Sequence, residues 1–278
     1  MKVHHIHYVH PVSKIEHKGC MIVPNGPLKG VIQLCHDRYD HIERYEMIMQ
    51  KLSETGCAVF GFHMVDYGDK KMVSLPPQLM VDVIHDGFLE ACNVLRERIQ
   101  EAAKAGICLP HILIGFGFGA LLTRLYVMKY EDVSALVLCG DEGFITHTSL
   151  LKKCRRLQKQ PQAVDVTAVN FTIREVYNEY FAKNDSSRFA WRVADPAEQK
   201  RLEQDVYATK DYALSTIYDM TTLYKAIELK GWIEACPREL PIFIMSGYLD
   251  PCSRFTRNLD VLLKEMQRSA LTNCFYRY

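Results

Sequence analysis

The stretch ILIGFGFGALLTRLYVMKY, residues 112–130, decides the fold. It begins with a strand-like apolar run, turns through Gly115, Gly117 and Gly119, and continues with apolar residues at helical spacing. The spacing matches the G-x-S-x-G of a nucleophile elbow, a sharp strand-to-helix turn that needs small neighbours and presents its middle residue above a sheet. Here that middle residue is Gly117, which tolerates a strained backbone but carries no nucleophilic oxygen.

Strand-like runs alternate with helical patterns on both sides of this turn. The strands are nearly continuous in apolar character, which is typical of a parallel sheet covered by helices on both faces. An antiparallel pair is predicted to precede them at 3–9 and 17–23. Further strands are predicted at 31–35, 57–62, 111–116 and 135–140, and helices at about 43–55, 80–104 and 118–130.

This alternation stops between residues 144 and 240, where the sequence becomes helical, charged and rich in aromatic residues. A strand pattern resumes in PIFIMSGYLDP at 241–251, followed by a helix at about 256–268 and the strand-like LTNCFYRY. We therefore predict an α/β core formed by residues 1–143 and 241–278, with an inserted helical cap at 144–240.

Composition excludes several classes of partner. The chain has 34 Lys and Arg against 33 Asp and Glu, so its net charge of +1 gives no general attraction to nucleic acid. It contains no apolar run of transmembrane or signal-peptide length, and we expect a cytoplasmic protein. The ten cysteines show no CxxC pair, so they are interpreted as reduced thiols, and neither a metal nor a cofactor is predicted.

Taken together, these motifs resemble the serine aminopeptidase and monoacylglycerol lipase or lysophospholipase branch of the α/β-hydrolases over nearly the whole chain. LCHDRYDHIERY at 34–45 is similar to the family's oxyanion turn, with His36 kept and Asp37 at the glycine position. The resemblance implies that the backbone N–H of Phe118 is an oxyanion donor. It also makes Asp250, in SGYLDP, the match to the triad acid.

The same resemblance shows where this sequence differs from the family's catalytic motifs. Gly117 stands at the nucleophile position, and no histidine follows Asp250, although the family places its base after the last strand. That strand, the histidine loop and the last helix would follow a segment like LTNCFYRY, so the last core helix is expected to be missing. Losing nucleophile or base typically costs about 10⁴ to 10⁶ in turnover. Asp37 would also oppose the charge on a reacting carbonyl, where donors are worth about 3–4 kcal/mol.

Three hypotheses remain. The leading one is a catalytically inactive homologue, a pseudoenzyme whose cap covers a pocket for an apolar or acyl-type small molecule, with Asp250 and Gly117 as remnants of the site. The second is an active carboxylic-ester hydrolase with a non-standard site near His36 or Cys252. The third is an interaction protein or truncated product that self-associates through a sheet face left uncovered by the missing helix.

Weaker patterns have plainer interpretations. The histidines at 4, 5, 7 and 10 are consistent with a metal site, but we favour the polar face of an edge strand. The polar residues His36, Asp37, Asp40 and His41 are interpreted as a loop retained from an oxyanion turn. The basic run KKCRRLQKQ at 152–160 is interpreted as a solvated helix face rather than a site for an acidic partner or phosphate.

Overall fold

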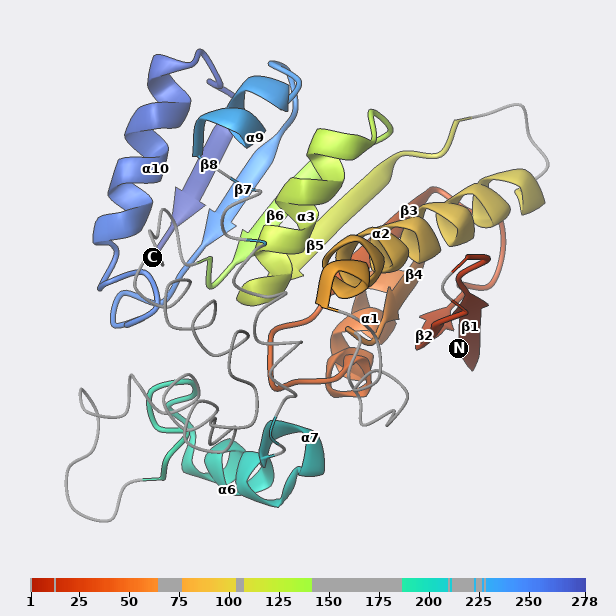
Figure 1. Ribbon diagram of the computed structural model, residues 1–278, viewed down its shortest axis with the longest axis horizontal. Coiled ribbons are helices and arrows are strands. Elements are labelled where there is room, and N and C mark those ends of the chain that lie inside the picture. Colours follow the sequence, from red (N-terminus) through yellow and green to blue (C-terminus); the bar gives the residue numbers. More distant parts are fainter. Residues whose placement is uncertain are drawn as a thin grey trace.

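The computed structural model describes residues 2–12, 14–64, 77–103, 108–141, 187–209, 211, 223, 227 and 229–278. Most of the predicted cap and the basic run at 152–160 lie outside these residues. The described part of the chain forms one large sheet with helices on its two faces and a small helical segment at one end (Figure 1).

The sheet has eight strands in the order β1-β2-β4-β3-β5-β6-β7-β8. β1 pairs antiparallel with β2, β2 pairs antiparallel with β4, and the other neighbours are parallel. The strands are β1 (Val3–Val9), β2 (Glu16–Ile22), β3 (Gly30–Cys35), β4 (Cys57–Phe62), β5 (His111–Phe116), β6 (Ala135–Cys139), β7 (Ile242–Met245) and β8 (Cys274–Arg277).

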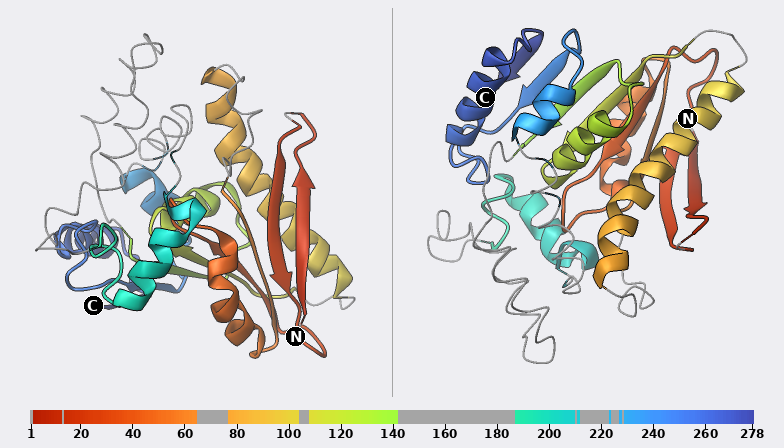
Figure 2. Two further views of the ribbon diagram at one scale, coloured as in Figure 1. Left: turned by 90° about the horizontal axis from the view of Figure 1, so that it is seen from below. Right: turned by 45° about the horizontal axis from the view of Figure 1, so that its top comes forward.

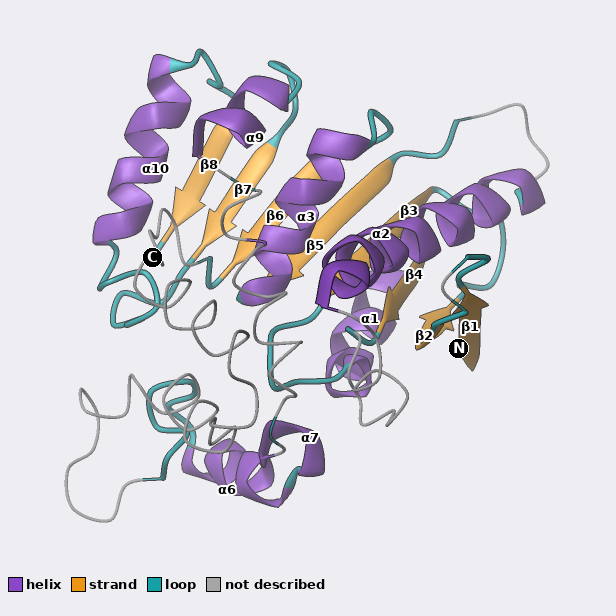
Figure 3. Ribbon diagram, in the orientation of Figure 1, coloured by secondary structure: helices purple, strands orange, loops and turns teal. Residues whose placement is uncertain are grey.

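Helices cover both faces of this sheet, while α6 and α7 lie beside the carboxyl ends of the central strands (Figures 2 and 3). η1 and α1 pack on one face, and α2, α3, α9 and α10 pack on the other. Their bounds are η1 (Ile42–Tyr45), α1 (Glu46–Ser53), α2 (Pro77–Ala102), α3 (Phe118–Lys129), α6 (Pro196–Gln204), α7 (Val206–Thr209), α9 (Leu229–Ala235) and α10 (Arg257–Arg268).

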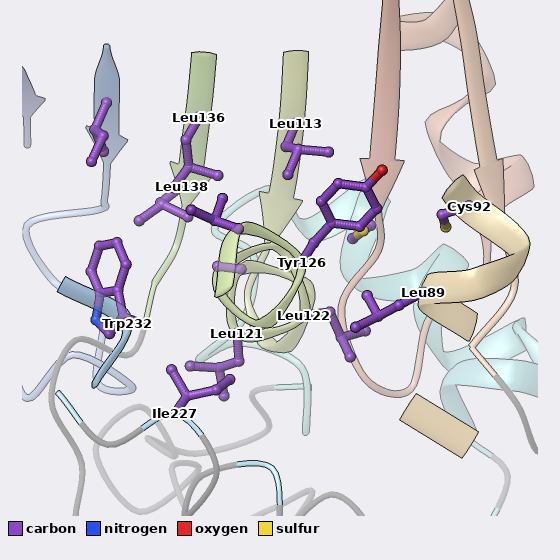
Figure 4. Close-up of a cluster of buried hydrophobic side chains, with 14 of the residues drawn as sticks. Leu89, Cys92, Leu113, Leu121, Leu122, Tyr126, Leu136, Leu138, Ile227 and Trp232 are labelled. Atoms are coloured by element: carbon purple, nitrogen blue, oxygen red, sulfur yellow. The ribbon is translucent and has the colours of Figure 1, made fainter. Parts of the chain in front are cut away.

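The larger core surrounds α3, the helix that follows the glycine turn (Figure 4). Leu121, Leu122 and Tyr126 of α3 are almost fully buried. Burying a large apolar side chain contributes about 1.5–3 kcal/mol, so α3 is held firmly to the sheet and fixes the turn at its start. The side chains packed around it include Leu89, Cys92, Leu113, Leu136, Leu138, Ile227 and Trp232.

The predicted fold class is confirmed, and the central strands and helices lie within a few residues of their predicted positions. The strand predicted within LTNCFYRY is confirmed as β8, whose backbone continues the sheet in parallel register with β7, pairing Phe243 with Phe275. Among the described residues no helix is both long and apolar enough to cross a membrane.

Candidate functional site

The glycine turn between β5 and α3 has the strained geometry that its sequence predicts. Gly117 has φ 52° and ψ −118°, a backbone conformation that residues with a Cβ rarely adopt. Added Cβ atoms would lie 2.5 Å from the Cα of Ala120 at Gly115 and 2.1 Å from the carbonyl oxygen of Cys35 at Gly119. Both flanking glycines are therefore needed for the helix to approach β5 and β3 so closely.

Asp37, in the loop after β3, fills the space above Gly117. Its Oδ1 accepts the backbone N–H of Phe118 at 2.7 Å and that of Arg38 at 2.8 Å. A Cβ built on Gly117 would lie 2.3 Å from this oxygen and 2.4 Å from the carboxyl carbon. The carboxylate thus occupies the volume that any side chain at position 117 would need, and it already engages the N–H donor at the start of α3.

His36 supports the loop from beneath and is fully buried. Its Nδ1 donates to the carbonyl oxygen of Asp37 at 2.7 Å, and its Nε2 accepts the backbone N–H of Met64 at 2.9 Å. These two partners require the neutral ring with its proton on Nδ1. Burial lowers the pKa of His36 to about 3, so the ring is neutral at physiological pH and both of its nitrogens are engaged.

Asp250 lies in the loop after β7, and its Oδ1 accepts the backbone N–H of Cys252 at 2.8 Å. A Cβ built on Gly140 would lie 3.9 Å from Asp250 Oδ2 and 4.0 Å from the backbone nitrogen of Gly117. The fold therefore brings together the glycine turn, the loop after β3 and the acid after β7, as expected where the carboxyl ends of parallel strands meet.

A cavity of about 490 Å³ opens over this constellation. Its lining includes Asp37, Gly117 and Asp250 on the core side. The opposite side is formed by residues from 187–209, which we call the lid segment because it covers the cavity. Apolar side chains contribute much of the lining: Tyr45, Phe116, Leu249, Ala190, Trp191, Val193 and Leu202.

Arg192 connects the lid segment to the loop after β3. Its guanidinium Nη2 lies 2.8 Å from Asp40 Oδ2 and 3.3 Å from Asp37 Oδ2, and its Nη1 donates to the carbonyl oxygen of Tyr39 at 2.9 Å. The Asp37 carboxylate is therefore compensated by a cation as well as by backbone donors. Sequence reasoning missed Arg192, because nothing in the charged 144–240 region distinguishes one arginine from another.

The cysteines and the histidines of β1 that the sequence singled out form no reactive pair or metal site among the described residues. The cysteines among the described residues are free thiols, and burial raises the pKa of Cys35 to about 12. Cys252 lines the cavity and is 9% exposed. His4, His5 and His7 project from the edge strand β1, and no three potential ligands within the described ranges are arranged to hold a metal ion.

Comparison with known proteins gives a family match and several structural matches. The family described as serine aminopeptidase, S33, matches residues 26–276. A highly thermostable carboxyl esterase from Bacillus coagulans, solved with glycerol, is 19% identical with a TM-score of 0.82, covering 100% of this chain and 89% of the esterase. A lipase in its open form is 15% identical with a TM-score of 0.76, covering 99% and 89%.

A soluble variant of monoglyceride lipase from Saccharomyces cerevisiae, in complex with a substrate analogue, is 16% identical with a TM-score of 0.64, covering 100% of this chain and 85% of the lipase. Identities this low establish a shared fold and nothing finer. Among curated proteins no sequence matches the chain.

Proposed function

The chain belongs to the serine aminopeptidase S33 family of α/β-hydrolases, and from that premise we propose that it is a catalytically inactive member whose pocket binds an apolar, acyl-type small molecule. The observation that carries this proposal is the position of the Asp37 carboxylate, against Gly117 and hydrogen-bonded to the N–H of Phe118.

Ester hydrolysis needs a nucleophile and a free oxyanion donor at this site. Gly117 lacks the first, and Asp37 occupies the second. A nucleophile must project from position 117, and donors must be available for the oxygen of the reacting carbonyl. Glycine supplies no nucleophile. The Phe118 N–H already binds an anion, so a substrate oxygen would have to displace a charge-compensated carboxylate. Losing one such donor costs about 10²–10³ in turnover, and the absent nucleophile adds a larger loss.

The alternative, an active esterase with a non-standard site, has little support from the same residues. His36 would have to act as the base, but both of its nitrogens are hydrogen-bonded and its pKa is lowered to about 3 by burial. Cys35, the cysteine next to His36 in the chain, could not supply the nucleophile, because it is fully buried and its raised pKa keeps it a thiol. A poorly basic ring and a protonated thiol do not form an activated pair.

The size and lining of the cavity support ligand binding. Its volume of about 490 Å³ lies within the range of roughly 300–1,000 Å³ that is usual for small-molecule pockets. The three lining aspartates, Asp37, Asp40 and Asp250, are matched in number by the lining arginines 38, 44 and 192. With no net charge from these groups, a neutral ligand with an apolar chain is favoured.

Two measurements on the purified chain test the two halves of the proposal. Hydrolysis of p-nitrophenyl butyrate and of 1-octanoylglycerol should not exceed the buffer blank. Titration calorimetry with 1-octanoylglycerol, kept below its micelle concentration, should show saturable binding.

Two exposed alanines of the lid segment provide a matched pair of variants. Ala194 lines the cavity and Ala197 does not, and both are exposed, so a large side chain should be tolerated at either position. Ala194→Trp should abolish binding, whereas Ala197→Trp should leave it unchanged. If both variants still bind 1-octanoylglycerol, the ligand does not bind in this cavity, and that half of the proposal is wrong. Turnover that Ala194→Trp alone abolishes would show that the site is catalytic.

A further inference from the structure

Charged side chains join the loop after β3 to the lid segment. We call this set the latch. Its members on the core are Asp37, Asp40, His41 and Arg44, and its members on the lid segment are Arg192, Glu198 and Asp205.

Four ion pairs of the latch cross between core and lid segment. Arg192 lies 2.8 Å from Asp40 and 3.3 Å from Asp37, Arg44 lies 2.6 Å from Glu198, and the Nε2 of His41 lies 2.9 Å from Asp205. The seven side chains are between 5% and 27% exposed. Salt screens partly buried pairs less than exposed ones, so these contacts hold the lid segment more firmly than ordinary surface ion pairs.

His41 differs from the other members because its charge can change near neutral pH. Its Nδ1 lies 2.9 Å from Glu43 Oε2, and its Nε2 lies 2.9 Å from Asp205 Oδ2. A neutral imidazole offers one donor and one acceptor, whereas both of these partners are carboxylate oxygens that only accept. The geometry therefore requires the protonated ring.

The remaining surroundings of His41 favour the same state. Burial disfavours the charged ring, but the hydrogen bonds to Glu43 and Asp205 outweigh it and raise the pKa of His41 above 6.5. Tyr207 packs against the ring with 4.9 Å between centroids. The Nε2 of a second histidine, His63, lies 3.0 Å from Glu43 Oε1.

The structure assigns His41 the role of a pH-dependent fastener, which helps to hold the lid segment over the pocket while its ring is charged and weakens that hold when the ring loses a proton, so that the open population grows. When the proton leaves, one nitrogen presents a lone pair to a carboxylate oxygen, so one of the two contacts becomes repulsive. The assignment rests on the proposed function, because it regulates access to that pocket.

Tryptophan fluorescence can measure the opening directly. The chain has two tryptophans. Trp191 lies in the lid segment and lines the cavity, whereas Trp232 is fully buried in the core. Acrylamide should therefore quench Trp191 selectively, and Trp191→Phe gives the baseline. Between about pH 6 and pH 9 the quenching constant should rise about twofold or more, with a midpoint above 6.5, as the open population grows.

Three variants identify the titrating group. His41→Gln should give high, pH-independent quenching, because the charge is absent throughout. His41→Arg should give low, pH-independent quenching, because the charge is permanent. His5→Gln, which removes an exposed histidine on β1, should titrate like the wild type.

The assignment is overturned if wild-type quenching does not change with pH, or if His41→Gln titrates like the wild type. Hydrogen exchange of wild-type peptides from 187–209 at both pH values, corrected for intrinsic rates, repeats the test without a substitution. Because no ligand is present, these results are independent of whether 1-octanoylglycerol binds, so the fastener and the proposed function can fail separately.

Discussion

At position 117 the backbone conformation and the neighbouring carboxylate both exclude a side chain. Gly117→Ser would place a Cβ 2.3 Å from Asp37 Oδ1 at a φ of 52°. We expect the free energy of unfolding to fall by about 2–5 kcal/mol, the sum of overpacking and backbone strain. Urea denaturation followed by circular dichroism measures the loss.

Removing the carboxylate should relieve part of that cost. The double variant Asp37→Gly/Gly117→Ser keeps the backbone strain at position 117 but removes the overlap between the new side chain and the carboxylate. It should therefore be more stable than Gly117→Ser alone, by about 1–3 kcal/mol. Equal stabilities of the two variants would contradict the contact described between these residues.

Two buried histidines should make the fold sensitive to acid. Burial, reinforced by His10, lowers the pKa of His17 to about 4, and burial lowers that of His36 to about 3. In the unfolded chain both histidines bind protons with a pKa near 6.5, which is higher than in the folded state. Their contribution to the free energy of unfolding is therefore fully present above pH 6.5 and is lost as the pH falls towards the folded pKa values. His17 alone accounts for about 3 kcal/mol between pH 6.5 and 4.

His17→Phe tests this, because its neighbours include the rings of Tyr8 and Phe88. The variant should lose about 3 kcal/mol less stability than the wild type between pH 6.5 and 4, measured by urea denaturation. His7→Gln, on the exposed side of β1, should behave like the wild type. A wild-type acid response in His17→Phe would show that the buried ring is not responsible.

Contacts between individual side chains could not be predicted from the sequence of this chain. The resemblance implies that Gly117 and Asp37 each depart from the family pattern. It does not show that the Asp37 side chain fills the volume above Gly117, because that depends on a contact between residues far apart in the chain and on one side-chain rotamer. The part played by Arg192 escaped prediction for the same reason.

At the scale of elements, the close approach of α3 to β3 should be the most demanding packing in the fold. Gly119→Ala would place a methyl 2.1 Å from a backbone oxygen that cannot rotate away, so the helix must shift at a cost of about 1–3 kcal/mol or more. Gly231→Ala in α9 is the control, since its methyl would meet only the flexible end of Met128 at 3.7 Å. Comparable losses in thermal unfolding for both variants would contradict the tight contact at Gly119.

Strands and helices were largely predictable because their apolar periodicity is a local property. β3 and β4 are nearly continuous apolar runs and match their predicted bounds to within one residue, since they are central strands with helices on both faces. β8 was predicted only as a strand-like segment without bounds, because it is an edge strand of four residues with mostly exposed side chains. Its identity comes from pairing with β7.

At the scale of the whole molecule, exposed apolar side chains gather toward the carboxyl-terminal edge of the sheet. Phe275 and Tyr276 of β8 are 61% and 57% exposed, and Met245 of β7 is 41% exposed. Exposed apolar side chains on an edge strand favour association between copies. We expect concentration-dependent association in sedimentation velocity that Phe275→Lys reduces, while Val12→Lys, which changes an 82% exposed valine elsewhere, leaves it unchanged.

The contact between Asp37 and Gly117 also restricts how this sequence can evolve. A mutation that restored serine first would meet the carboxylate and lose stability, whereas one that removed the carboxylate first would take a partner from Arg192 and gain no nucleophile. Neither first step offers an advantage for selection to act on. The pair would therefore act as an epistatic ratchet: if the proposed loss of catalysis is correct, a return to serine at position 117 is hard to reach one mutation at a time.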